Sequence, residues 1–269
     1  MKQLFHISND HSTAHQQVLS IRLGEGHAGF AVTNKNANEL YELAYAATDE
    51  WNEYTLTGWY EQYPALNKSY NDTLIAFDFP QATMLPGNGV QPGDPVALLR
   101  AAGFPAQASD TALDPVAAWQ SATLYSTPPH LRGLLTKKWP SASFQHQYSL
   151  GLKTLANAGG DDRILVDFRA KDFAIVAIKG NKFILAQSFE YSTPADVLYA
   201  LLHICQQFSL SQQDVELLVS GLIDRDSALY KELYQYFVAV SFRGADWTGN
   251  AEHPAHFFTS FNDLAKCAS

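Results

Sequence analysis

The chain has 269 residues, of which 46% are hydrophobic and 17% charged, and its net charge is −9. This composition can bury a large core and excludes an intrinsically disordered chain. Residues 1–150 hold 8 basic and 13 acidic side chains, and residues 151–269 hold 10 and 14, so neither half is basic. Because a nucleic-acid surface needs clustered cations, we expect no nucleic-acid partner.

The apolar stretches are short. Val197 to Cys205 is among the longest, and it falls far short of the roughly 20 residues that span a bilayer. We therefore expect no membrane span. The first residues lack the continuous apolar segment of a secretory signal. Two cysteines, Cys205 and Cys267, are too few to brace a small secreted fold, so we expect a cytoplasmic protein with reduced thiols.

The first half of the chain is predicted to alternate strands and helices. Period-two apolar patterns indicate strands, and spacing near 3.6 indicates helices. In chain order, the expected elements are a strand pair at 17–34 with a turn at Gly24-Glu25-Gly26, a third strand at 39–47, a helical segment at 49–63, a strand at 72–79, a helix at 130–138, a strand at 141–145 and a helix at 148–156. An insertion, near 80–125, begins with turn-forming residues that predict an ordered surface loop.

The second half is predicted to repeat this order. Its expected elements are a strand pair at 163–178, a third strand at 182–189, a helix at 193–208, a strand at 216–223, a helix at 227–236, a strand at 237–242 and a helix at 257–267. Thr193 is a suitable N-cap, followed by Pro194 at the first helical position. The segment 157–162 is the expected hinge between the halves.

The halves can be laid on each other with an almost constant offset. An offset of 146 places Leu19 on Leu165 and Ala28 on Ala174, and an offset of 144 places 72–79 on 216–223. This agreement indicates an internal duplication. The predicted units are residues 1–159, which carry the insertion, and residues 160–269.

Three meandering strands, a helix, then strand-helix-strand-helix, used twice, resembles the actin-like ATPase fold, which is a duplicated ribonuclease H-like domain. The chain also resembles a family of uncharacterised Bacteroidetes proteins of this fold, named only as a domain of unknown function. That resemblance lies in 186–193, which runs into the apolar helix, and in the C-terminal segment 253–258 with Leu264 and Cys267. It implies an α/β fold of two ribonuclease H-like units in tandem, with mixed five-stranded sheets flanked by helices.

The resemblance also implies where a nucleotide would bind. In this fold the turn of each hairpin wraps phosphates, and an Asp at the end of each first strand serves a hydrated metal ion. In the first hairpin Gly24 and Gly26 can make the turn, but Ile21 faces the position of Asp167. In the second hairpin Asp167 is present, while Arg169 stands where Gly is needed. Arg169 could instead bind a phosphate directly.

Two further positions belong to the same comparison. The adenosine-side pattern, a pair of glycines after an apolar strand, is matched only by Ser220-Gly221. Asp78 ends its strand where related enzymes place a residue that orients the nucleophile. Both Asp78 and Asp167 also suit an ordinary turn or cap. A ribonuclease H-like nuclease is not expected, because Ile21 removes the central carboxylate of its metal site.

Other motifs are weak. His6, His11 and His15, with Asp10, could ligate a transition metal, but their spacing is more typical of a surface arm, and we expect no metal site. The chain has no Walker loop, Gly-x-Ser-x-Gly elbow or Cys-x-x-Cys pair.

Four aromatic residues, Trp51, Trp59, Tyr60 and Tyr63, recur at near-helical spacing. This spacing predicts a core face, with an exposed binding surface as the alternative.

Our main hypothesis is a catalytically inactive actin-like scaffold or interaction module that binds another protein, because the fold is complete while the nucleotide motifs are degraded. No cofactor is then expected. The alternative is an ATPase or small-molecule kinase that binds ATP with magnesium through Asp167 and Arg169, with Asp78 orienting the nucleophile. The sequence leaves the oligomeric state open.

Overall fold

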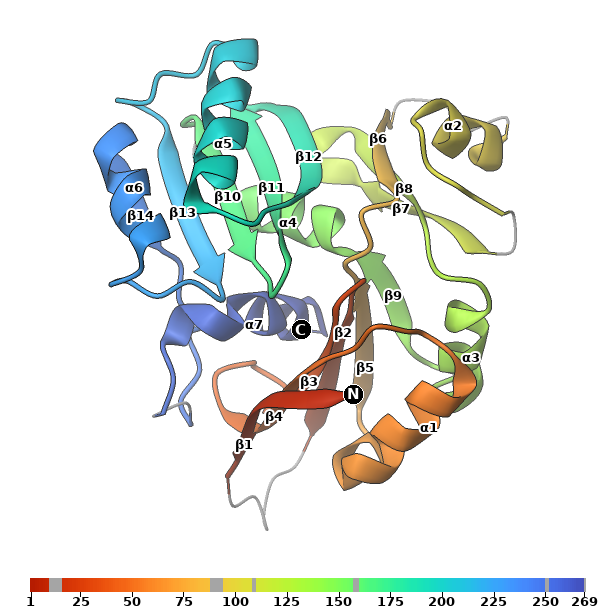
Figure 1. Cartoon of the computed structure of the whole chain (residues 1–269). Coiled ribbons are helices and arrows are strands. Elements are labelled where there is room, and N and C mark those ends of the chain that lie inside the picture. The colour runs from red at the N-terminus through yellow and green to blue at the C-terminus, as the bar shows by residue number, and fades with distance from the viewer. Residues whose placement is uncertain (10–15, 88–93, 108–109, 157–159, 250–251, 269) are drawn as a thin grey trace. The chain divides into compact units, whose positions relative to one another are not determined.

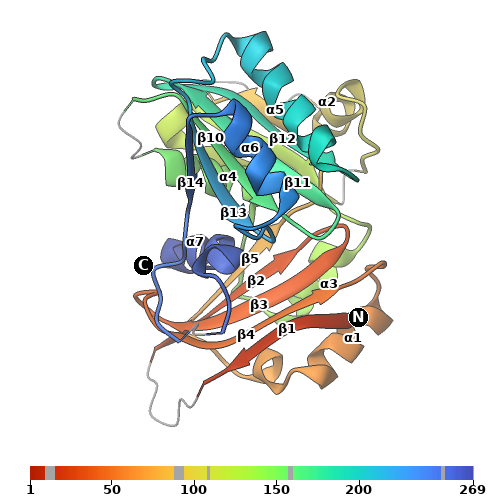
Figure 2. The same ribbon diagram turned by 60° about the vertical axis from the view of Figure 1, so that its left-hand side comes forward.

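The computed structural model describes residues 1–9, 16–87, 94–107, 110–156, 160–249 and 252–268. Its contacts divide the chain into two compact units (Figures 1 and 2). Unit 1 comprises residues 1–150, 246–252 and 261–269, and unit 2 comprises 151–245 and 253–260. The predicted division into 1–159 and 160–269 stays a prediction. Asp10, His11, His15 and residues 157–159 of the expected hinge lie outside the described residues.

Unit 1 is built on a six-stranded sheet in the order β1-β4-β3-β2-β5-β9. Its strands are β1 (Lys2–Ser8), β2 (Gln17–Leu23), β3 (His27–Asn34), β4 (Leu40–Ala47), β5 (Asp72–Phe77) and β9 (Ser143–His146). The strands β1 to β4 pair antiparallel, whereas β5 runs parallel to both β2 and β9. β1 was not predicted, because most of its residues are exposed and leave no apolar alternation to read. It makes this sheet one strand larger than expected.

Both faces of this sheet are buried. Successive residues of a strand point to opposite faces. Phe30 packs edge-on against Trp59 and Tyr63 at the end of α1 (Glu53–Gln62). The preceding residue, Gly29, lies against Phe261 of α7 (Thr259–Ala265). The residues Gly29 and Phe30 therefore place α7 and α1 on opposite faces, and the expected core role of Trp59 and Tyr63 is confirmed.

The insertion has a sheet of its own. Its strands are β6 (Ala82–Pro86), β7 (Thr111–Val116) and β8 (Ser121–Ser126), in the order β6-β8-β7, and its helix is α2 (Pro95–Ala101). Leu99 of α2, Ala106 and Leu124 of β8 form a separate small core. The loop predicted at the start of the insertion is only partly described, because residues 88–93 lie outside the described part. Two further helices, α3 (Leu131–Lys138) and α4 (Gln147–Leu155), follow in the chain.

Unit 2 is built on a five-stranded sheet in the order β12-β11-β10-β13-β14. Its strands are β10 (Arg163–Phe168), β11 (Asp172–Lys179), β12 (Lys182–Glu190), β13 (Glu216–Gly221) and β14 (Ala239–Phe242). The helices α5 (Pro194–Phe208) and α6 (Ala228–Tyr236) bury one face of it, in a core that includes Val166, Ile175 and Leu201. Gly151 of α4 meets Leu165 and Val176 on the other face.

Helix α5 begins as predicted. Thr193 is its N-cap and Pro194 its first residue, and the carboxylate of Asp196 accepts the backbone N–H groups of Ser192 and Thr193. No helix in the described part of the chain is long and apolar enough to cross a membrane.

Five strands of the unit 1 sheet match the five strands of the unit 2 sheet in order and direction. β4-β3-β2-β5-β9 in unit 1 has the same order and the same strand directions as β12-β11-β10-β13-β14 in unit 2. The expected mixed α/β fold is thus confirmed. The internal duplication stays an interpretation of this shared order.

Candidate functional site

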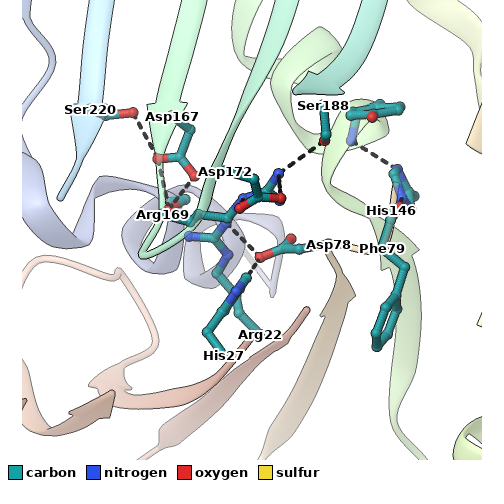
Figure 3. A network of polar contacts seen from close by, with 12 residues as sticks. Arg22, His27, Asp78, Phe79, His146, Asp167, Arg169, Asp172, Ser188 and Ser220 are labelled. Carbon is teal, nitrogen blue, oxygen red and sulfur yellow. Dashed lines mark hydrogen bonds and ion pairs between the residues drawn. The ribbon is translucent and has the colours of Figure 1, made fainter. Parts of the chain in front are cut away.

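Three charged or polar side chains meet at the end of the central strands of unit 1 (Figure 3). Arg22 comes from β2, His27 begins β3, and Asp78 follows β5. A guanidinium nitrogen of Arg22 lies 2.7 Å from Asp78 Oδ2, and His27 Nε2 donates to the same oxygen at 2.8 Å. All three residues are at most 3% exposed. The cluster is therefore a buried ion pair with a second donor on its carboxylate.

Aromatic rings enclose this cluster. The guanidinium of Arg22 lies 5.4 Å from the ring centre of Phe261, and the ring of His27 stacks on Tyr45 at 5.5 Å. Tyr45 and Phe261 contact each other edge-on. These rings exclude water, and a pair in such surroundings is screened little by salt. Any hydroxyl group that bonded Oδ2 of Asp78 would first have to displace Arg22 or His27 from that oxygen.

The strand register corrects one expectation from the sequence. Arg22 lies opposite Gly29 in β3 and Ala76 in β5, one residue before the end of its strand. In unit 2 the corresponding position is Asp167, which lies opposite Ala174 and Ser220. The offset that set Ile21 against Asp167 was wrong by one residue, because the hairpins align at their turns rather than at their first apolar residues. Where the resemblance implied a carboxylate, unit 1 has a guanidinium.

Both hairpin turns have the same backbone closure. The N–H of Gly24 donates to the carbonyl of His27 at 2.9 Å, and that of Arg169 donates to the carbonyl of Asp172 at 2.8 Å. A Cβ on Gly24 would lie 2.1 Å from the imidazole of His27. Glycine is therefore required at position 24, because any side chain there would clash with the ring of His27, which bonds Asp78. Gly26 accepts the backbone N–H of Thr48 at 3.2 Å, which ties this turn to the end of β4.

In unit 2, Asp167 is surrounded by hydroxyl groups. Its Oδ1 accepts Ser220 Oγ at 3.0 Å, and Ser260 Oγ lies 3.4 and 3.5 Å from its two oxygens. Asp167 is 7% exposed and both serines are buried. Of the residues proposed from the sequence, Asp167 and Ser220 therefore lie together. Asp167 is the carboxylate that could face a hydrated cation, since Ser220 and Ser260 contact it through neutral hydroxyl groups.

Arg169 bonds within its own hairpin. Its Nε and one terminal nitrogen each lie 2.8 Å from an oxygen of Asp172, and that terminal nitrogen donates to Ser188 Oγ at 2.9 Å. This is a bidentate fork, the strongest form of Arg–carboxylate pair. Arg169 is 2% exposed, so its guanidinium is held by protein acceptors that a phosphate would have to replace.

Gly221 has a structural reason to be glycine. Its φ is +85°, and a Cβ there would lie 2.0 Å from the backbone oxygen of Phe168. β13 ends at Gly221, and the N–H of Leu222 donates to that same oxygen. The Ser220-Gly221 pair therefore has a structural role, because it lets the end of β13 pack closely against β10.

Two further buried histidines bond backbone carbonyl groups. His146 is buried and its Nε2 bonds the Phe79 carbonyl at 2.9 Å. His256 Nε2 bonds the Ile223 carbonyl at 2.7 Å, and desolvation lowers the pKa of this histidine. Among the residues that the structure describes, no group of three or more His, Cys, Asp or Glu could hold a metal ion.

Sequence reasoning missed Arg22, His27 and Asp172. The sequence did contain a signal for Arg22. It is the one charged residue in β2, whose other residues are apolar or uncharged, and a charge buried in a strand needs a partner. The partner itself could not be named, because Asp78 lies 56 positions further along the chain.

The fold of this chain is shared with solved structures of one class. The structure is similar to a Bacteroides thetaiotaomicron protein with an actin-like ATPase fold and unknown function, with a TM-score of 0.77 and 18% identity, over 96% of this chain and 99% of that one. It is also similar to a chain of the PilM–PilN type IV pilus biogenesis complex, with a TM-score of 0.63 and 10% identity, over 93% and 98% of the two chains. The chain has the actin-like ATPase fold.

Within that class, residues 7–240 match the model of the family described as "Protein of unknown function (DUF3822)". The chain belongs to this family, as its resemblance to a Bacteroidetes family of unknown function led us to expect. No curated protein matches the sequence.

Proposed function

We propose that this chain is a non-catalytic protein of the actin-like ATPase fold that acts by binding another protein. The observation that carries the proposal is the buried pair of Arg22 and Asp78, with 2.7 Å between nitrogen and oxygen. Arg22 places a cation where the resemblance implies the first metal-binding carboxylate. The same guanidinium neutralises Asp78, the candidate for orienting the nucleophile. A magnesium ion would be repelled by Arg22 rather than held there.

The residues present fit a magnesium nucleotide poorly in unit 2 as well. Phosphate-wrapping turns depend on close approach to the backbone, which a glycine permits, and Arg169 occupies that position. Its guanidinium already has the two oxygens of Asp172 as acceptors. The proposed function therefore involves no nucleotide, metal ion or other cofactor.

Two considerations support a protein partner. A fold retained without its catalytic groups still offers surfaces for binding. A structurally similar protein is part of the PilM–PilN complex, so this architecture occurs in an assembly with another protein. A cytoplasmic location, also expected from the sequence, remains part of the proposal.

Asp167 is the observation that favours the alternative, an ATPase or small-molecule kinase. It retains the carboxylate position in unit 2 and has only hydroxyl groups, from Ser220 and Ser260, among its recorded donors at 3.0–3.5 Å. Such a carboxylate could face a hydrated magnesium ion.

Isothermal titration calorimetry with ATP and magnesium separates the two functions. We expect no heat of binding at millimolar nucleotide and no release of phosphate. Tight, magnesium-dependent binding that Asp167→Ala abolishes would overturn the non-catalytic proposal. Asp214→Ala is the matched control, because Asp214 is an exposed carboxylate of the same unit.

A further inference from the structure

Unit 1 contains a cavity of about 370 Å³. Its lining comes from the turn after β2, the segments that follow β4 and β5, the segment between α2 and β7, and the end of β8 with the segment after it. This volume is at the small end of the roughly 300–1,000 Å³ range of ligand sites. It is large enough for a side chain and too small for a folded element. Several of its residues, including Pro105, Gln107 and Pro129, are exposed, so the cavity opens at the surface.

One wall of the cavity is a fixed aromatic pair. Trp51 donates its indole N–H to the carbonyl of Gly24 at 2.8 Å and meets Phe79 edge-on, with ring centres 6.3 Å apart. Phe79 is 3% exposed, whereas Trp51 is only half-buried. The indole thus has an accessible part whose orientation is set before any ligand arrives. Such preorganisation lowers the entropic cost of binding.

The charge of the lining has one sign. Glu25, Asp49 and Asp110 line the cavity, and its described lining includes no Lys, Arg or His. Glu25 and Asp49 are exposed near the mouth, and Asp110 is buried and oriented by the N–H of His130, which donates to its Oδ1 at 3.0 Å. A hollow with low-dielectric walls concentrates such a potential. The occupant that complements both the carboxylates and the indole is a cation.

We propose that this cavity receives an arginine side chain from an extended segment of a partner protein. Arginine satisfies both parts of the lining, because its planar guanidinium stacks on an indole and bonds carboxylates through several N–H groups. The open mouth leaves room for the backbone that carries the side chain. The net charge of −9 favours encounter with a basic partner. The assignment of this arginine to a partner protein rests on the proposed function. The preference of the cavity for a cation follows from its lining alone and does not rest on the proposed function.

The test is a titration of the full chain followed through its indole N–H resonances by NMR. The probe is acetyl-Ala-Arg-Ala-amide, and its comparison is the same peptide with citrulline, which keeps the shape of arginine but lacks its charge. Trp51→Phe identifies the resonance of Trp51. We expect a saturable shift of that resonance with the arginine peptide and about tenfold weaker binding of the citrulline peptide.

Variants locate the binding within the cavity. The combined change Glu25→Gln and Asp49→Asn should weaken the arginine peptide about fivefold or more, while Glu61→Gln, an exposed carboxylate of α1 outside the lining, should leave it unchanged. Unshifted resonances of the other four tryptophans establish that the variants are folded.

Equal binding of the two peptides, no binding of either, or insensitivity to the paired substitution would each overturn the inference. These results do not depend on ATP. Nucleotide binding in the calorimetric experiment would overturn the proposed function and leave the cation site standing.

Discussion

Replacing Arg22 by methionine should destabilise unit 1 strongly. The change keeps most of the length of the side chain and removes its charge. Asp78 would remain buried with His27 as the surviving recorded donor to its Oδ2. Breaking one partner of a buried pair costs about 3–5 kcal/mol, because the remaining charge loses its compensation. Since His27 stays bonded, we expect a loss near the lower limit, about 3 kcal/mol.

Tryptophan fluorescence during urea unfolding measures this loss in the right unit. All five tryptophans, which are Trp51, Trp59, Trp119, Trp139 and Trp247, belong to unit 1. With a urea dependence of about 2–3 kcal/mol per M, the midpoint should fall by roughly 1–1.5 M. Lys137→Met is the control, because Lys137 is an exposed cation of α3 and its loss should cost no more than about 0.5 kcal/mol.

A double variant tests whether the cost comes from the pair itself. Arg22→Met combined with Asp78→Asn removes both charges, so it should be more stable than the sum of the two single changes predicts, by about 1–3 kcal/mol. Strictly additive losses, or a loss below about 1 kcal/mol for Arg22→Met, would refute the reasoning that the two groups neutralise each other.

Three further predictions concern other parts of the chain. Gly221→Ala should lower the stability of unit 2 by at least about 1–2 kcal/mol, because φ is +85° at this position. Gly58→Ala is the comparison: a Cβ there meets nothing within 4 Å, so this change should stabilise α1 by about 0.5–1 kcal/mol. Unfolding followed by circular dichroism measures both changes. Asp196→Asn should increase hydrogen exchange at the start of α5 at neutral pH. The backbone N–H groups of Ser192 and Thr193 lower the pKa of Asp196 from 3.8, so this contribution is present above 3.8 and lost as the pH falls through the lowered value, where variant and parent should converge. Burial raises the pKa of Cys205 to about 11, so a thiol reagent at pH 8 should label Cys267, which is exposed, and reach Cys205 only on unfolding.

Much of the fold could be predicted because its strands are buried on both faces and its helices have clear limits. The apolar runs of β2, β3, β10 and β11 mark two hairpins, and Thr193-Pro194 marks the start of α5. β1 could not be predicted in the same way. It is an edge strand whose pairing with β4 depends on main-chain hydrogen bonds, and an exposed edge leaves little pattern in the sequence.

The candidate site was predicted less well than the fold, and the reason is register. Shifting a strand by one residue exchanges the side chains that share a face and a neighbour. Sequence alignment by apolar positions placed Ile21 against Asp167, whereas the turns place Arg22 there. The absence of a carboxylate at this position stays a prediction of the resemblance, and Arg22, which the register places there, was not identified from the sequence. A pairing over such a sequence distance is fixed by the neighbouring strands β2 and β5, which no local pattern specifies.

The two hairpins reach charge balance by different means. In unit 1 the cation comes from the strand and the anion, Asp78, from the end of the next parallel strand; in unit 2 the cation Arg169 and the anion Asp172 stand within one turn. Each guanidinium is thus neutralised inside its own unit. A nucleotide site needs cationic or amide donors kept ready for phosphate, and donors already bonded to carboxylates must be freed at a cost before they can serve. The cavity beside Trp51 differs from both hairpin turns, because its described lining has three carboxylates, an indole ring and no Lys, Arg or His side chain. This contrast in charge balance is why we assign binding by this protein to the cavity rather than to the hairpin turns.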